Sequence, residues 1–423
     1  MREQSRTPSR LVIVRLGLPI FLAVLSTGGH AEGLSPLLGA IGEIKPIVDA
    51  RLRFESVEQV PFTEDASSVT LRARLGFETG KAWSTSLLIE GEAVVPLDSD
   101  YNSTTNGHTL YPVVADPESY ELNRLQLINT AIRDTTVTLG RQRIILDDHR
   151  FVGNVGWRQN EQTFDALRVV NRTIPDITID LSYVDQVNRI FGPDGLPGTN
   201  VGRFHGDSML ANVAWQSKLG KLTVFGYLLD FREAPLPQRD SSRTAGLRFA
   251  GERSLSKIKL SYLFSYAIQD NYTDNSLSFS NSYYLGELTG SYRQYSLGLG
   301  LEVLDGNGVK GFTTPLATLH RFQGWADKFL TTPVNGIQDA YVNAGFLSKG
   351  VGPLDMLGIS LSWHKFDSQR LSIDYGNELD LQLQGKYRRT TGTLKYASYA
   401  ASSTTPLAQR DTNKLWAQVD FAW

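Results

Sequence analysis

The feature that most constrains this chain is the alternation of long and short connections between segments of strand-like sequence. From about residue 44 onward, apolar residues recur at every second position, as in 48–54 and 69–77, and charged or polar residues stand between them. Such a period of two is typical of a β-strand with one apolar and one polar face. Connections after odd-numbered segments are long, whereas those after even-numbered segments are short, as at 80–82. Outer-membrane barrels have this asymmetry of short periplasmic turns and longer extracellular loops.

The pattern predicts an all-β fold, namely a transmembrane antiparallel up-and-down β-barrel of about eighteen strands, with sixteen as the alternative. An even count returns both chain ends to the periplasmic side, and closure leaves no strand edge unpaired in lipid. The bacterial outer membrane is therefore the expected location, with lipid around the barrel. The expected strands are 44–57, 68–79, 83–94, 119–131, 133–144, 162–172, 176–188, 205–217, 221–231, 241–251, 257–269, 280–293, 295–304, 337–348, 355–365, 375–387, 390–400 and 411–423.

The chain ends also fit a secreted barrel. Residues 1–31 resemble a signal peptide, because four arginines precede or enter an apolar run at 16–25 and small residues precede Glu32. That run is roughly half of the ~20 residues that a spanning helix needs, which disfavours a membrane anchor. We therefore expect a signal peptide at 1–31 and a barrel domain at 32–423. The final strand ends on the aromatic Trp423, which predicts recognition by the barrel-assembly machinery.

Charge and composition exclude several classes of function. The formal net charge is −2, and removal of the signal peptide, which carries a net charge of +3, leaves −5. So mild a charge argues against nucleic acid as a partner. Without cysteine, neither disulfides nor thiolate metal sites are available. The histidines outside the signal peptide stand in no metal or nucleophile motif, although a pair of Ser360 and His364 is conceivable. We expect no enzyme, no metal site and no cofactor.

The charged faces of the strands predict a lumen, because each Arg or Lys on the lipid face near the midplane would cost about 2 to 4 kcal/mol. A barrel of this strand number leaves room for an aqueous channel. Arginine and lysine in such a channel attract carboxylates. The alternative is that opposite charges pair across neighbouring strands and brace the wall. Strand phase selects the following lumen residues: Arg51, Arg53, Arg72, Arg74, Arg248, Asp339, Lys386, Arg388 and Asp420.

Two regions go beyond generic strand patterning. The first comprises LGRQR at 139–143 and TFDALR at 163–168, and the second is ATLHRFQGWADKF at 317–329. Together they resemble the alginate export family of outer-membrane barrels. The resemblance implies an eighteen-stranded, porin-like channel with an arginine-rich constriction that passes a polyuronate.

The same resemblance adds three residues to the expected lumen. Arg141 and Arg168 are its motif arginines, and Asp165 is their expected partner. Arg141 shares its strand phase with the lipid-facing Val137 and Leu139, so a bulge would be needed to turn it inward.

The predicted function is a monomeric channel that passes anionic poly- or oligosaccharide, such as an alginate-like polyuronate, through an Arg- and Lys-lined lumen. One alternative is a general or carboxylate-selective porin for nutrient uptake. Another is a structural or adhesive barrel whose lumen is closed by paired charges. The longest loop, 305–336, is expected to fold into the barrel mouth and narrow it.

Overall fold

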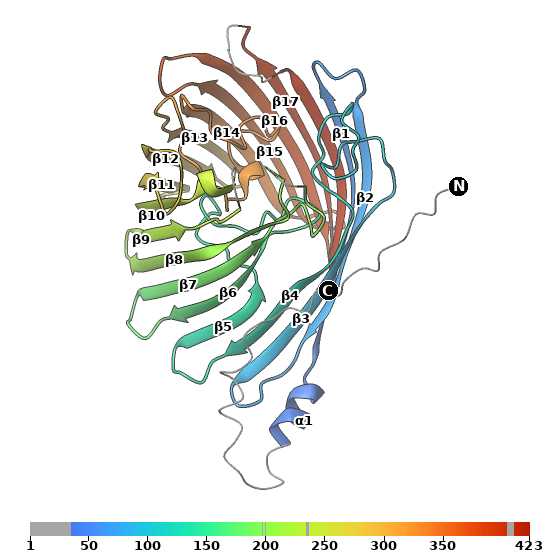
Figure 1. Cartoon of the computed structure of the whole chain (residues 1–423), viewed down its shortest axis with the longest axis vertical. Coiled ribbons are helices and arrows are strands. Elements are labelled where there is room, and N and C mark those ends of the chain that lie inside the picture. The colour runs from blue at the N-terminus through green and yellow to red at the C-terminus, as the bar shows by residue number, and fades with distance from the viewer. Residues whose placement is uncertain (1–34, 197, 199, 234–236, 404–409) are drawn as a thin grey trace, which may run out of the picture.

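The chain closes into a single barrel (Figure 1). The computed structural model describes residues 35–196, 198, 200–233, 237–403 and 410–423, so the predicted signal peptide lies outside the described residues. Within these residues, eighteen antiparallel strands form one sheet, in which sequence neighbours pair and β1 also pairs with β18. The predicted fold class and strand number are confirmed, and sixteen strands are excluded for the described part of the chain.

Every predicted strand corresponds to an observed one, with ends that shift by a few residues. The first half of the wall comprises β1 (Lys45–Gln59), β2 (Ala66–Glu78), β3 (Thr85–Pro96), β4 (Ser119–Asn129), β5 (Thr135–Gln142), β6 (Thr163–Asn171), β7 (Ile177–Asn188), β8 (Arg203–Ser217) and β9 (Gly220–Leu229). The second half comprises β10 (Ser242–Leu255), β11 (Ile258–Asn271), β12 (Ser280–Tyr292), β13 (Tyr295–Leu304), β14 (Ile337–Val351), β15 (Leu354–Asp367), β16 (Asp374–Tyr387), β17 (Thr390–Ala401) and β18 (Thr412–Ala422).

The wall is apolar outside and charged inside, the reverse of a soluble protein. In β16, Leu379, Leu381 and Leu383 are 41–44% exposed, whereas Glu378 and Asp380 between them are fully buried. Successive side chains of a strand point to opposite faces, so these leucines meet lipid and these carboxylates face the lumen. The charged faces of the strands thus line the interior, as predicted.

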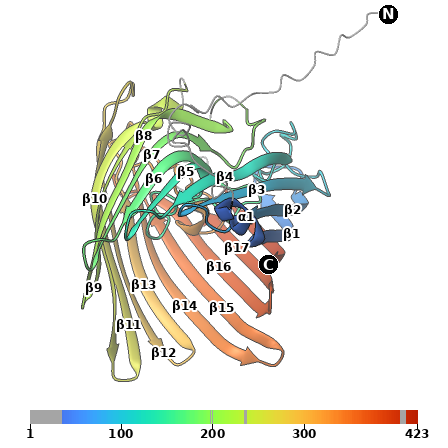
Figure 2. The same cartoon turned by 90° about the horizontal axis from the view of Figure 1, so that it is seen from below.

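Long and short connections lie at opposite ends of the barrel. The turn between β10 and β11 spans two residues, 256–257, whereas the loop between β13 and β14 spans 305–336. The helix α1 (Ser35–Gly42) lies at the short-turn end, below the strands in Figure 1 and in front of them in Figure 2, which views the molecule from below. It packs on the turn after β2, where the Gly80 N–H donates to the Ala40 carbonyl at 2.9 Å. By analogy with other outer-membrane barrels, this end faces the periplasm.

Among the described residues, no helix is long and apolar enough to cross a membrane.

The barrel closes along a polar seam between its first and last strands. Arg51 and Arg53 of β1 stand opposite Asp420 and Gln418 of β18. Arg51 Nε donates to Asp420 Oδ1 at 2.7 Å, and Arg53 Nε donates to Gln418 Oε1 at 2.9 Å. The seam therefore combines ladder hydrogen bonds with side-chain hydrogen bonds on the lumen face.

Candidate functional site

Two long loops fold into the barrel and bind each other. Residues 143–162 and 305–336, which we call the plug, form a parallel bridge between Val152 and Leu316. The Gly153 N–H donates to the Leu316 carbonyl at 2.8 Å, and the Gln162 amide donates to the same carbonyl at 3.1 Å. Figure 1 shows η4 (Leu319–Arg321), which belongs to the plug, within the ring of strands. The prediction that loop 305–336 narrows the barrel is confirmed.

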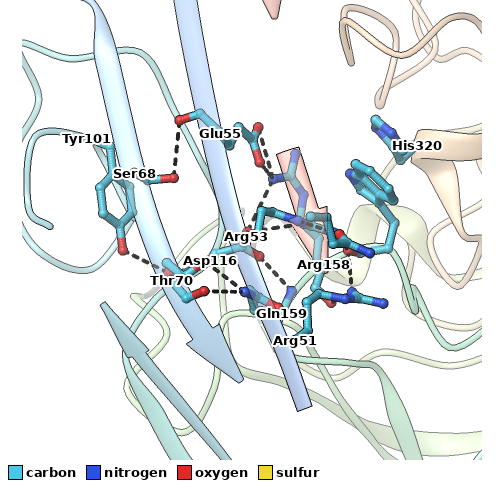
Figure 3. A network of polar contacts seen from close by, with 12 residues as sticks. Arg51, Arg53, Glu55, Ser68, Thr70, Tyr101, Asp116, Arg158, Gln159 and His320 are labelled. Carbon is cyan, nitrogen blue, oxygen red and sulfur yellow. Dashed lines mark hydrogen bonds and ion pairs between the residues drawn. The ribbon is translucent and has the colours of Figure 1, made fainter. Parts of the chain in front are cut away.

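The plug packs on a charged sector of the wall, formed by the lumen faces of β1–β4 and β18. Arg53 is fully buried and donates to the Trp157 carbonyl of the plug at 2.5 Å, with its guanidinium 4.2 Å from the Trp157 ring. Arg51 donates to the same carbonyl at 2.9 Å. Figure 3 shows how these arginines, Arg158 and Asp116 converge between β1 and the plug.

Glu161 is the main anionic link between the plug and the charged sector. Its Oε1 accepts from Arg143 Nε and Asn123 Nδ2, both at 2.6 Å, and lies 3.6 Å from Arg74 Nη2. Its Oε2 accepts from Asn154 Nδ2 at 2.7 Å. Although burial opposes ionisation, Arg74 and Arg143 lower the pKa of Glu161 to about 2. Both glutamate oxygens are therefore fully engaged in holding the loop.

The wall also has an aromatic sector, formed by β9, β12 and β15–β17, and β17 adjoins the charged sector at β18. Phe151 of the plug packs on Phe225 and Tyr283, with ring centroids 4.8 and 5.2 Å apart. Phe329 of the plug packs on Phe366 at 4.8 Å. The plug is thus held by ion pairs in one sector and by apolar contacts in the other.

The two loops meet at Asp327. Its Oδ2 accepts from Arg158 Nη2 and Lys414 Nζ, both at 2.9 Å, and its Oδ1 accepts from His320 Nδ1 at 2.7 Å. Burial lowers the pKa of His320 well below its usual range, so the ring is neutral and its Nε2 accepts from Lys395 Nζ at 2.7 Å. The His320 ring stacks on Trp157 of the other loop, with centroids 4.6 Å apart.

An extracellular cavity of about 630 Å³ opens above this junction. Part of its lining is apolar, including Phe62, Phe191 and Phe204. Basic groups outnumber acidic ones in the lining, because Asp240 and Asp327 are its carboxylates among the described residues. The basic lining residues are Arg158, Arg189, Arg239, Lys310, Lys328 and Lys414.

A second cavity of about 490 Å³ lies on the lumen face near the short turns. Its lining includes Lys221, Arg248 and Glu287. Among the described residues, the linings of the two cavities have no member in common. The two cavities are therefore separate, one among the long loops and the other near the short turns.

Most of the predicted lumen residues face inward and form an ion pair or a charged hydrogen bond with another side chain. Arg72 pairs with Asp49, and Arg74 pairs with Glu92. The remaining pairs are Arg51 with Asp420 at 2.7 Å, Arg53 with Asp116 at 3.5 Å, Arg168 with Asp180 at 2.5 Å, Arg248 with Asp148 at 3.3 Å, and Asp339 with His364 at 2.9 Å. Lys386 shares the phase of Glu378 and is exposed near the short turns. Bracing of the wall therefore describes these contacts better than an open ring of arginines.

Arg141 and Asp165 are placed differently from the expectation. Asp165 lies between Phe164 and Ala166, which are both buried in the inner cluster, so strand alternation puts its side chain on the outer face. Arg141 stands opposite Asp165 and donates to both of its oxygens, at 2.7 and 2.9 Å. The ladder between β5 and β6 runs regularly through this pair, so no bulge turns Arg141 inward.

Arg388 is also misplaced by the sequence pattern. It lies in the turn after β16 with a φ of 52°, and its guanidinium is 5.2 Å from the Tyr387 ring. Because the strand ends before this residue, its phase carries no information about the lumen.

His364, the conceivable partner of Ser360, belongs to the wall. Its Nδ1 hydrogen-bonds to Asp339 at 2.9 Å, and its ring stacks on Phe366 with centroids 5.6 Å apart.

The residues around Asp327 were not selected from the sequence. Arg158 lies in a loop, where the alternation of strand faces does not apply. Its partner Glu55 is 103 residues away in the sequence. Lys414 does carry a signal, since it shares the lumen phase of Trp416 and Gln418 in β18. The motif at 317–329 contains the other partners, but its sequence does not say which wall residues it meets.

Comparison with known proteins agrees with this architecture. No protein-family model matches the chain, and no curated protein matches its sequence. Among solved structures, OccK5 (OpdH) of Pseudomonas aeruginosa matches with a TM-score of 0.67 at 12% identity, over 91% of this chain and 99% of that one. OpdK of the same organism, solved with vanillate, matches with a TM-score of 0.65 at 14% identity, over 90% and 98%.

OccK2 (OpdF) of P. aeruginosa, in complex with glucuronate, also has a TM-score of 0.65, at 15% identity, over 91% of this chain and 98% of that one. The chain therefore has the fold of these outer-membrane porins, and the predicted location in the bacterial outer membrane agrees with that fold. The similarity supports a porin-like barrel and not alginate export in particular.

We expect the anion-to-cation permeability ratio of the barrel to fall as the pH rises through about 8. Burial and the neighbouring Lys414 lower the pKa of Lys328 to about 8, against the opposing effect of Glu378 and Asp327. A lysine is charged below its pKa, so the extracellular cavity keeps this charge at lower pH and loses it at higher pH. One charge at a wet site changes the anion-to-cation permeability ratio roughly threefold.

Reversal potentials measured on either side of that pH give this ratio. Lys328→Arg is the matched control, because arginine stays protonated throughout. A ratio that falls equally in both proteins would assign the titration to another group.

Proposed function

We propose that this chain is an outer-membrane uptake channel for small carboxylates, which enter through the extracellular cavity. The observation that carries the proposal is the excess of basic groups in that cavity, directly above the plug. A basic cleft with low-dielectric walls concentrates anions and speeds their entry. The apolar part of the lining offers contact to the body of a solute whose carboxylate faces the cations.

The arrangement of the two cavities supports a small solute over a polymer. The plug stands between them, and it is bound to both sectors of the wall. A polysaccharide would need a continuous wide path, whereas a small molecule needs only local movement of the plug. The solutes named with two structural neighbours, vanillate and glucuronate, are both carboxylates of this size class.

Liposome swelling with paired solutes tests the proposal. Proteoliposomes should admit glucuronate faster than glucose, and vanillate faster than vanillyl alcohol, because each pair differs in the carboxylate. Replacing Lys310 and Arg239 of the extracellular cavity with glutamine should reduce the preference about threefold. Lys81→Gln, in the exposed turn after β2, is the matched control and should leave the preference unchanged. Equal rates within both solute pairs would contradict the proposal.

Passage of an alginate-like polyuronate has weaker support, since it rests on the sequence resemblance alone. Mannuronate and guluronate oligomers added to the same channel distinguish the two functions. Block by the oligomers, together with indifference to glucuronate, would favour the polymer.

A further inference from the structure

A carboxylate of the protein already occupies the position where a solute carboxylate would be expected to bind. Asp327 is held by three donors from separate parts of the fold: Arg158 of one plug loop, His320 of the other, and Lys414 of β18. Both of its oxygens are engaged. A guanidinium, an ammonium and an imidazole N–H are the groups that proteins use to bind a carboxylate ligand.

The donors lie at the floor of the extracellular cavity. Arg158, His320 and Lys414 all line it, as do Asp327 itself and Lys328. A carboxylate that enters from outside therefore reaches the group of donors that now binds Asp327. The local backbone also shows that this carboxylate is held in place, because Asp327 has a φ of 61°, in the left-handed region that side chains rarely adopt.

Lys414 makes the exchange of carboxylates selective. It is 5% exposed, and Asp327 is its ion-pair partner at 2.9 Å. Removing Asp327 without replacement would leave a buried ammonium without its counter-charge, which is strongly unfavourable. An anionic solute can supply that counter-charge, whereas a neutral solute of the same shape cannot.

Asp327 also sits in the segment that holds the plug in place. The Ala326 N–H donates to Glu378 Oε1 of β16 at 2.7 Å, and the Trp325 ring lies 3.7 Å from Lys395 Nζ of β17. Phe329 packs into the aromatic sector. Displacement of Asp327 therefore pulls on the contacts that fix 325–329 to β15, β16 and β17.

We propose that Asp327 is a built-in carboxylate that occupies the solute site formed by Arg158, His320 and Lys414, and that an incoming carboxylate displaces it and releases 325–329. The plug then opens only in exchange for an anion. A ligand shifts such an equilibrium because it binds the open state better than the closed one. This inference rests on the proposed function and adds the site and the opening step.

Asp327→Asn tests the exchange. Asparagine keeps the size of the side chain but not its charge, so the donors lose their anion. We expect a higher conductance in planar bilayers without solute, and glucuronate affinity about tenfold tighter by calorimetry in detergent. Asp327→Glu, which keeps the charge, should stay near the wild type. Asp270→Asn removes a carboxylate that pairs with Arg243 on the outer face, and it should change neither quantity.

A cysteine reporter provides a second test that leaves Asp327 intact. The chain contains no cysteine, so Ala326→Cys introduces a single thiol at a residue that is 2% exposed. Glucuronate should speed the labelling of this thiol by an impermeant maleimide about tenfold, and glucose should not.

The outcomes distinguish failure of the proposed displacement of Asp327 from failure of the proposed uptake of carboxylates. Suppose that the wild type prefers carboxylates, that Asp327→Asn has the conductance and glucuronate affinity of the wild type, and that glucuronate does not speed labelling of the thiol in Ala326→Cys. The displacement of Asp327 is then refuted, whereas the proposed uptake of carboxylates stands. If the wild type neither binds nor passes carboxylates, both fail. Should Asp327→Asn not fold, the labelling result alone decides.

Discussion

Replacing residues 309–333 with two glycines should raise the single-channel conductance several-fold. The deletion removes Gln323, Asp327 and Phe329, through which this loop contacts the wall. The new ends can be joined without strain, because the Gly308 N–H already donates to the Val334 carbonyl at 2.8 Å. A barrel of this strand number holds an aqueous channel when no loop fills it. Recordings in planar bilayers measure the change, and we expect a factor of about three or more.

A second deletion controls for loss of loop sequence as such. Replacing 104–110 with two glycines shortens an extracellular loop at a point where the Val114 N–H donates to the Asn102 carbonyl at 3.0 Å. This deletion should leave the conductance unchanged. If excision of 309–333 also had no effect, loop 143–162 would be sufficient to close the barrel. Persistent closure in the absence of both loops would favour a structural or adhesive barrel.

Glu161→Ala should lower the free energy of unfolding by about 1 to 3 kcal/mol, because it leaves the Asn154 amide without its acceptor and removes one of the two carboxylates that each of Arg74 and Arg143 contacts. Urea unfolding of the refolded barrel measures the loss. Glu252→Ala removes a carboxylate whose ion pair with Lys259 is largely exposed, and it should cost no more than about 0.5 kcal/mol. A loss of similar size in both variants would show that Glu161 does not anchor the plug.

The same glutamate predicts a dependence on pH. The pKa of Glu161 is about 2 in the folded chain, below its usual value, so its contribution is complete above the unfolded pKa and is lost as the pH falls towards 2. The difference between the wild type and Glu161→Ala should therefore shrink on acidification below about pH 4. A difference that stayed constant down to the folded pKa would mean that charge plays no part in the anchor.

Strand positions could be predicted because period-two alternation and loop length are local signals. Leu379 and Glu378 already reveal the two faces of β16 in the printed sequence. The sequence resemblance misplaced Arg141 and Asp165, because the alternation continues through β5 and β6 and puts both side chains on the outer face. Phase misplaced Arg388, because β16 ends at Tyr387, before that residue.

The site was less predictable because its partners come from distant parts of the chain. Asp327 and Lys414 are separated by 87 positions, and Arg158 and Asp327 by 169. Neither pair leaves a spacing that a single sequence can show. The motif at 317–329 drew attention to the correct loop, yet the partners of each side chain depend on how two loops cross inside a closed wall.

The polar seam between β1 and β18 has a consequence for the assembly of the barrel. Arg51 and Arg53 leave the ribosome long before Asp420 and Gln418, their partners across β1 and β18. Until the last strand docks, these guanidinium groups lack the counter-charge and the amide that the finished barrel supplies, and an open sheet also exposes unpaired strand edges. Pairing of β1 with β18 therefore supplies the missing backbone hydrogen bonds and the partners of both arginines in one step. A partly closed barrel lacks both, so it is less stable than the closed one on two counts. Closure of the seam is thus the step that distinguishes a correctly assembled barrel from an incomplete one.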